Sequence, residues 1–210
     1  MKKLIGLAIA VIVLAGGYFV FMKMRKQPIY TKSSVAFEKD LRKLWEDHIT
    51  WTRNFIISDL ADLADKAAVT ERLLKNQDDL GDAIKGLYGE EAGKKLAQLL
   101  RDHILIAAEV VAAAKAGNTQ ALDAASKKWT ANADDLAKFL SDANPFLPYN
   151  VLQDMLHKHL ELTTGEVVSR LKKDWKADIE FYDKGHEHML MLSDALASGV
   201  QKQFPHAFKA

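Results

Sequence analysis

The chain contains no cysteine among its 210 residues. Disulfides, thiolate metal sites, iron–sulfur clusters and cysteine nucleophiles are therefore excluded, although the absence is compatible with any cellular compartment. Net charge is also nearly absent, because 29 Lys and Arg side chains balance 28 Asp and Glu, leaving a formal charge of +1. Such a chain has no overall field to attract nucleic acid, and no basic face is interleaved with aromatic residues. Nucleic acid is therefore not an expected partner.

Several motifs that mark enzymes are missing as well. The sequence has no G-x-S-x-G nucleophile turn, no phosphate-binding loop and no dinucleotide-binding fingerprint. No Glu-x-x-His pair occurs, so the pattern of ferritin-like di-iron proteins is excluded. With no recognisable acid/base pair, the sequence gives no basis for assigning a reaction.

Proline and glycine are scarce, with 4 and 11 residues. Ala, Leu, Lys, Asp and Glu dominate beyond residue 34, and almost nothing there suggests strands. Helical periodicity between terminator signals predicts an all-α, antiparallel up-down bundle of four to six helices over residues 35–210. The expected helices are Val35–Asp62, Lys66–Leu87, Glu90–Ala116, Thr119–Ala143, a fifth that starts near Tyr149 and a sixth that ends the chain.

The end of the fifth helix has two possible positions. Thr163 and Glu166 have the spacing of a capping box, which would start a new helix at that point. Alternatively, the chain turns near Lys173, where two lysines suit a helix C-terminus and Asp174 suits the next N-cap. The second position gives neighbouring helices of similar length, about 25 and 30 residues, and we favour it.

One long hydrophobic run is present, at the N-terminus. Residues 4–22 carry no charge, and as a helix they would span about 28 Å, close to the hydrocarbon thickness of a bilayer. A cleavable signal peptide is the alternative, but bulky residues occupy Phe19–Met22, where small ones would mark cleavage. We therefore predict a single-pass membrane anchor over residues 1–26 and a linker over 27–34. The short N-terminal tail with two lysines favours an extracytoplasmic bundle.

Five of the expected helices each place one polar side chain on the apolar stripe. On helical wheels these inward residues are His48, His103, Asn132, His159 and His186. If neighbouring helices are antiparallel, each of the five lies about 12 to 14 residues from the same pole of the bundle. All five therefore fall in one layer near mid-bundle. Isolated core histidines have no reason to share a level, so this layer is the candidate site.

Neutral imidazoles that converge in an apolar bundle would bind iron, copper, zinc or nickel, whereas Mg²⁺ and Ca²⁺ prefer oxygen ligands. We predict that the four histidines bind a transition metal, with Asn132 as a fifth ligand or an orienting donor. Haem held by two histidines is a second option, although large aromatic residues leave little room for it. Without a metal, the layer would be a buried hydrogen-bond network that fixes helix register.

Residues near His186 could support such a site. Asp183 lies three positions earlier, a spacing that can hold the second imidazole nitrogen. Tyr182 is one turn before His186, and Asp178 one turn before Tyr182, so both could extend the chain of hydrogen bonds. His188 is expected on the opposite face of this helix.

Other polar residues carry weaker predictions. Glu166 and Arg170 lie one turn apart on the predicted inner face, where we expect a partly buried ion pair or contact with a ligand. His157 and His206 are expected at the surface. The stretches "EEAGKK" and "KNQDD" are expected to be solvated helix ends and faces.

Four segments resemble a family of small bacterial all-α proteins: "LWEDHITWTR", "NQDDLGDAI", "HLELTT" and "DWKADIEFYDKGHEHML". The resemblance covers about residues 37–208, and its motifs contain His48, His159 and His186. It implies an all-α fold and an anchor added to a soluble module, but no activity. A membrane-tethered sensor or interaction module without a metal is therefore the alternative to a metal-binding bundle.

Overall fold

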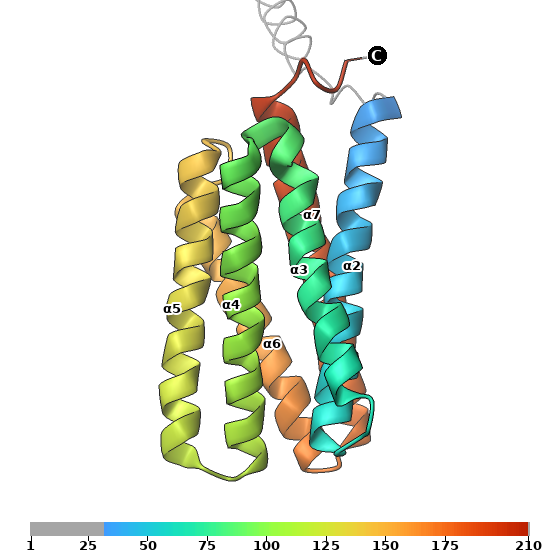
Figure 1. The fold of residues 1–210 in the computed structure, drawn as a ribbon, viewed down its shortest axis with the longest axis vertical. Coiled ribbons are helices and arrows are strands. Elements are labelled where there is room, and N and C mark those ends of the chain that lie inside the picture. Colours follow the sequence, from blue (N-terminus) through green and yellow to red (C-terminus); the bar gives the residue numbers. More distant parts are fainter. Residues whose placement is uncertain (1–31, 210) are drawn as a thin grey trace, which may run out of the picture. The chain divides into compact units, whose positions relative to one another are not determined.

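The computed structural model of the protein describes residues 32–209, which form six α-helices and no strand (Figure 1). The predicted helical bundle is thereby confirmed. The helices are α2 (Lys32–Leu60), α3 (Lys66–Tyr88), α4 (Glu90–Lys115), α5 (Thr119–Ala143), α6 (Tyr149–Leu171) and α7 (Trp175–Gln203). Consecutive helices pack side by side, and α2 also packs against α7, so the six close into a ring.

The helices alternate in direction along the chain (Figure 1). We call the half of the bundle with the α3–α4 and α5–α6 turns the upper half. The lower half contains the α2–α3, α4–α5 and α6–α7 turns. A ring of six helices encloses a wider centre than four helices do, and the tryptophans Trp45 and Trp129 occupy it as buried core residues.

Side-chain caps explain where two of the helices begin. The side chain of Asn118 accepts a hydrogen bond from Ala121 N at 3.0 Å, and that of Asp174 accepts one from Ala177 N at 3.1 Å. Helix α6 ends at Leu171, so the chain turns near Lys173 as we favoured and not at Thr163. No glycine is present at this turn, and Lys173 itself adopts a left-handed backbone with φ 60°.

The structure tests the predicted anchor and linker only at residues 32–34, the last three residues of the linker. Helix α2 begins at Lys32, so residues 32–34, predicted as linker, are helical. The predicted anchor and the rest of the linker lie outside the described residues. Within residues 32–209, no helix combines the length and apolar character that a membrane crossing requires.

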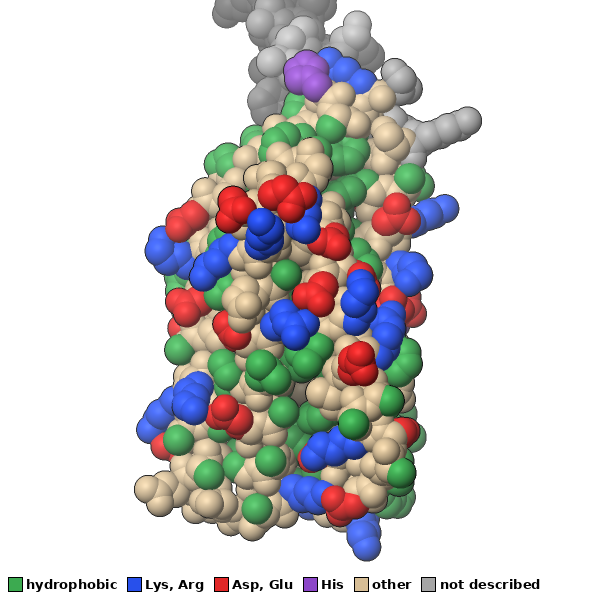
Figure 2. Space-filling model, viewed as in Figure 1, with side chains coloured by type: hydrophobic (Ala, Val, Ile, Leu, Met, Phe, Trp, Pro, Cys, Tyr) green, Lys and Arg blue, Asp and Glu red, His purple; other side chains and the backbone are tan. Residues whose placement is uncertain are grey.

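Helices α3 and α4 approach each other closely because both carry a glycine at the crossing. A Cβ atom added at Gly81 would lie 2.5 Å from the carbonyl oxygen of Gly93. This pair brings α3 and α4 together in the upper half of the bundle. On the outside, positive and negative side chains are interspersed (Figure 2), and many form exposed pairs one turn apart, such as Lys43–Asp47 and Lys127–Asp123.

Candidate functional site

Three of the four predicted ligands meet in the centre of the bundle. His48 from α2, His103 from α4 and His159 from α6 are only 2 to 3% exposed. The ring of His159 lies between the other two, with its centre 5.7 Å from that of His48 and 5.9 Å from that of His103. Three alternate helices of the ring therefore deliver one imidazole each to a common level, which we call the histidine layer.

His103 has both ring nitrogens occupied. The indole Nε1–H of Trp129 donates to His103 Nε2 at 3.1 Å, so that nitrogen must carry the lone pair. The proton is then on Nδ1, which donates to Asn132 Oδ1 at 2.7 Å. The Asn132 amide in turn donates to the Leu99 carbonyl at 3.1 Å. Asn132 thus orients His103, and His103 could bind a metal only by losing one of these bonds.

His48 and His159 differ from His103 in this respect. The Nδ1 atoms of both rings are buried and make no hydrogen bond of normal geometry, although the side chain of Gln77, whose Oε1 is also unpaired, lies close enough to His48 to interact with it. The Trp45 ring lies edge-on to that of His48, with 5.5 Å between the ring centres, and covers another side of the layer. Buried polar atoms are nearly always bonded, so two orphaned nitrogens in neighbouring rings require an explanation.

All three imidazoles are held in the neutral form. Burial lowers the pKa of His48 to about 3; the nearby His103 adds to the effect, and the side chain of Gln77 opposes it. Burial likewise lowers the pKa of His103 to about 4. The pKa of His159 is lowered by burial and then by His48 and His103. Neutral rings keep a lone pair for a Lewis acid at any physiological pH.

The prediction that His186 points inward is wrong. Its imidazole is about one-third exposed, and its Nε2 lies 3.3 Å from the exposed carboxylate of Glu46. The inner stripe of α7 runs instead through Gly185 and Met189. On a helical wheel the apolar Trp175 and Ile179 lie on the same side as His186 and favour that side as the inner stripe, but both are more than half exposed.

The residues predicted to support His186 do not form the predicted chain of hydrogen bonds. Asp183 is exposed. The Tyr182 ring lies beneath the Arg53 guanidinium, 5.2 Å from its centre, and 6.1 Å from the His186 ring. His188 bonds the Met155 carbonyl at 2.7 Å through its Nε2. The predicted relay from Asp178 to His186 is therefore not formed.

Asp178 belongs instead to a group of four charges below the layer, two buried carboxylates and two partly buried guanidiniums, which we call the ion cluster: Arg53, Glu166, Arg170 and Asp178. Arg53 donates hydrogen bonds to both carboxylate oxygens of Asp178, and a third to Glu166 Oε1 at 2.8 Å. Arg170 donates to Asp178 at 2.9 Å. Glu166 is buried and Arg170 partly buried, but the predicted pair between them is not formed, because Glu166 bonds Arg53 and Arg170 bonds Asp178. Burial raises the pKa of Glu166, against the opposing effect of Arg53.

Two residues of the buried centre were missed by the sequence analysis. Asn76 and Gln77, in the stretch "KNQDD" that was expected to be solvated, are 0% exposed. Asn76 donates to the Leu44 carbonyl at 2.9 Å, and Gln77 to the Leu73 carbonyl at 2.8 Å. Their spacing from Leu73 and Leu80 places them on the apolar stripe of α3, and that spacing was the available signal.

Cofactor binding is limited by what surrounds the layer. Within residues 32–209, no group of three or more His, Cys, Asp or Glu side chains is arranged to hold a metal ion. The two nitrogen atoms that are free to coordinate a metal are the Nδ1 atoms of His48 and His159. Cavities of ≈ 60 Å³ and ≈ 50 Å³ lie above and below the layer, and neither is large enough for haem.

Fold and site together define a class of protein, an all-α bundle of six antiparallel helices with a neutral histidine layer in its dry centre. Neither a family model, nor a curated protein, nor a solved structure matches the chain. The resemblance to small bacterial all-α proteins stays a prediction.

Proposed function

We propose that the bundle binds one transition metal ion between His48 and His159. The observation that carries this proposal is the pair of orphaned Nδ1 atoms in neutral rings whose centres are 5.7 Å apart. With a metal–nitrogen distance of about 2 Å and about 1 Å from nitrogen to ring centre, two imidazoles on one ion have centres up to roughly 6 Å apart. The observed separation fits such a bridge.

The free-energy cost of unpaired buried nitrogens favours a bound ion between the two rings. Each buried nitrogen without a partner costs about 1–3 kcal/mol relative to a bonded one. An ion shared by the two rings would relieve both costs at once. An apolar pair of side chains would avoid the costs altogether, so packing alone does not account for two histidines here.

Copper in its monovalent state suits this environment best. Both donors are uncharged, and no carboxylate joins the histidine layer among the described residues. Burying a doubly charged ion without a counter-charge costs far more than burying a single charge, because the solvation penalty grows with the square of the charge. Imidazole nitrogen is a suitable ligand for copper.

His103 would act as a positioning residue in this site. Its ring is stacked on that of His159, with 24° between the planes. The bond that His103 accepts from Trp129 and the bond that it donates to Asn132 fix its ring, so His103 limits the orientation that His159 can adopt. Second-shell contacts of this kind tune the affinity of a metal site.

The test is metal content of the full chain, purified in detergent, loaded anaerobically with Cu(I) and then desalted. We expect one copper per chain, and we expect His48→Leu and His159→Leu each to lose it while remaining folded. His157→Leu is the matched control, since His157 lies on the same helix but is half-exposed and bonds Asp134. A copper-free parent chain, or equal loss in the control, would contradict the proposal.

We also propose that residues 1–26 tether the bundle to the outer face of the cytoplasmic membrane. The uncharged run over residues 4–22 supports the tether. Protease added outside spheroplasts should digest the bundle in intact preparations. Digestion only after lysis would reverse the assigned orientation, and recovery of the full chain in the soluble fraction would exclude the tether.

A second candidate function is an interaction module, and exposed apolar residues at the α6–α7 turn favour it. Leu171 is 38% exposed, while Trp175 and Ile179 are each 53% exposed. Such residues on a surface can mark a binding site for another protein. A photo-crosslinking side chain at position 175 should then capture one specific partner in cells, and a control at exposed Lys138 should not. No cross-linked product at position 175 would contradict it.

A further inference from the structure

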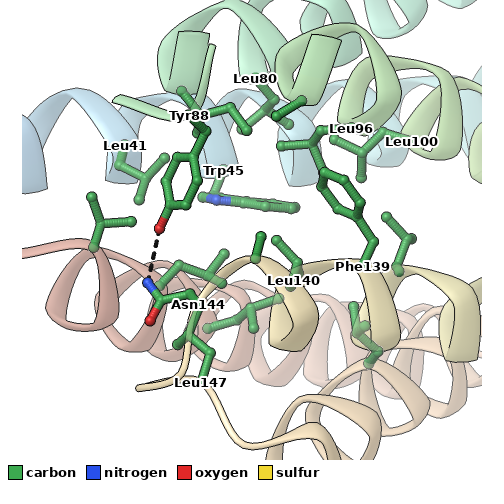
Figure 3. Close-up of a pocket in the computed structure, with 18 of the residues that line it drawn as sticks. Leu41, Trp45, Leu80, Tyr88, Leu96, Leu100, Phe139, Leu140, Asn144 and Leu147 are labelled. Carbon is green, nitrogen blue, oxygen red and sulfur yellow. Dashed lines mark hydrogen bonds between the residues drawn. The ribbon is translucent and has the colours of Figure 1, made fainter. Parts of the chain in front are cut away.

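A cavity of ≈ 60 Å³ lies in the upper half of the bundle, between the histidine layer and the α3–α4 and α5–α6 turns (Figure 3). All six helices contribute to its lining, which is almost entirely aliphatic and aromatic. A single water needs about 10–15 Å³ on this measure, so the space equals about four to six waters. An apolar cavity of this kind stays dry, yet protein interiors normally contain few voids larger than one water.

One polar atom in the lining has no partner. The indole of Trp45 extends into the middle of the cavity (Figure 3), and its Nε1–H is buried without a hydrogen bond. The residue is only 6% exposed, so water does not satisfy this donor from outside. A buried N–H of this kind is rare in native proteins. It would be satisfied by an acceptor on a molecule inside the cavity.

The other polar groups at the cavity are already paired. Asn144 donates to the Tyr88 hydroxyl at 2.8 Å (Figure 3), and that hydroxyl donates to Gln203 at 2.7 Å. The side-chain oxygen Oδ1 of Asn144 accepts from Phe146 N at 2.9 Å. These bonds link α3, the α5–α6 loop and α7 at the upper end of the cavity. Trp45 is therefore the one free donor among the described lining residues.

The lining also restricts the charge of an occupant. No Asp, Glu, Lys, Arg or His lines the cavity among the described residues, and burial raises the pKa of Tyr88, which keeps its hydroxyl neutral. A charged molecule would lose its hydration without finding a counter-charge. A neutral, apolar molecule loses little on leaving water and gains contact with the lining.

We infer that this cavity binds a small, uncharged and largely apolar molecule of about acetone size, whose hydrogen-bond acceptor pairs with the indole N–H of Trp45. The cavity, the neutral lining and the free donor carry this inference together. It does not rest on the proposed metal site.

Two small probes of equal shape test the inference. Acetone carries a carbonyl acceptor, and isobutene replaces that oxygen with a CH₂ group. With the full chain in lipid nanodiscs, both should bind, and the ratio of acetone affinity to isobutene affinity should be about 3- to 10-fold higher in the parent chain than in a Trp45→Phe variant, because only the parent offers the hydrogen bond. Acetone should also shift the indole ¹⁵N–¹H resonance that is missing from Trp45→Phe.

Three variants separate the outcomes. Trp45→Phe should keep both probes but lower the ratio of acetone affinity to isobutene affinity, and Ala92→Leu, which fills part of the cavity, should weaken both. His159→Leu should lose copper and keep the parent ratio, so failure of the metal site is distinguishable from failure of this cavity. Binding of neither probe, or a ratio that Trp45→Phe leaves unchanged, would overturn the inference.

Discussion

The histidine layer and the ion cluster are both buried and polar, but they differ in how completely their atoms are bonded. In the ion cluster, two positive and two negative side chains neutralise each other. Arg53 bonds Glu166 and both oxygens of Asp178, and Arg170 also bonds Asp178. In the histidine layer, only His103 is fully bonded, and two Nδ1 atoms have no partner.

This difference separates a structural role from a binding role. A buried network whose members are all bonded specifies packing and leaves nothing for a ligand. A buried network that contains unpaired imidazole nitrogens can still bind a ligand. The ion cluster therefore holds the lower ends of α2, α6 and α7 together, while the histidine layer is the part of the core that can receive an ion.

The largest expected effect is a loss of folding stability at acidic pH. The histidines of the layer have folded pKa values below the ordinary value of 6.5, about 3 for His48 and about 4 for His103. As pH falls below 6.5, the unfolded chain binds protons that the folded chain does not, so stability is lost between pH 6.5 and about 4. With three histidines at about 1.4 kcal/mol per pH unit each, the free energy of unfolding should fall by up to roughly 4 kcal/mol per unit.

Urea unfolding of the metal-free chain at several pH values would measure this slope. The raised pKa of Glu166 acts in the opposite direction, and offsets part of the loss. A His159→Leu variant should show a slope smaller by about one-third. A free energy that stays constant between pH 6.5 and 5 would show that the layer is not held neutral.

The next effect comes from breaking the ion cluster. Arg53→Met leaves Glu166 and Asp178 buried without their main partner, and should lower the free energy of unfolding by about 3–5 kcal/mol. Arg42→Met removes an exposed pair with Asp194 and should cost less than about 1 kcal/mol. Both variants should still bind copper. Similar losses in the two would mean that the cluster contributes no more than a surface pair.

A smaller effect is expected at His103, the histidine of the layer whose ring nitrogens are both hydrogen-bonded. Asn132→Leu removes the acceptor of the His103 Nδ1–H and should cost about 1–3 kcal/mol. Gln98→Leu is a matched change on the exposed face of α4, where the lost bond to Asp102 should cost under about 0.5 kcal/mol. Thermal unfolding checks both. An Asn132→Leu chain as stable as its control would show that His103 needs no orientation.

Much of the fold follows from local signals in the sequence. Asn118 and Asp174 cap their helices with their own side chains, so the starts of α5 and α7 can be predicted from a few residues. The depth of His48, His103 and His159 follows from helix lengths and antiparallel order. These features depend on short stretches of chain and on simple geometry.

The rotation of α7 could not be predicted in the same way. Trp175 and Ile179 are apolar but exposed, and Gly185 is buried although it contributes no apolar side chain, so the pattern pointed one residue away from the true inner stripe. The partner of Glu166 was missed for a related reason. Arg53 lies 113 residues away in sequence, and only packing of α2 against α6 and α7 brings it there.

The most direct test of the central claim follows the histidine ring nitrogens by ¹⁵N NMR while Cu(I) is added anaerobically to the full chain. The account predicts that Nδ1 of His48 and of His159 shift together and saturate at one equivalent, while both nitrogens of His103 keep their hydrogen-bonded shifts. Unchanged resonances for His48 and His159, or shifts confined to surface histidines such as His157, would contradict it.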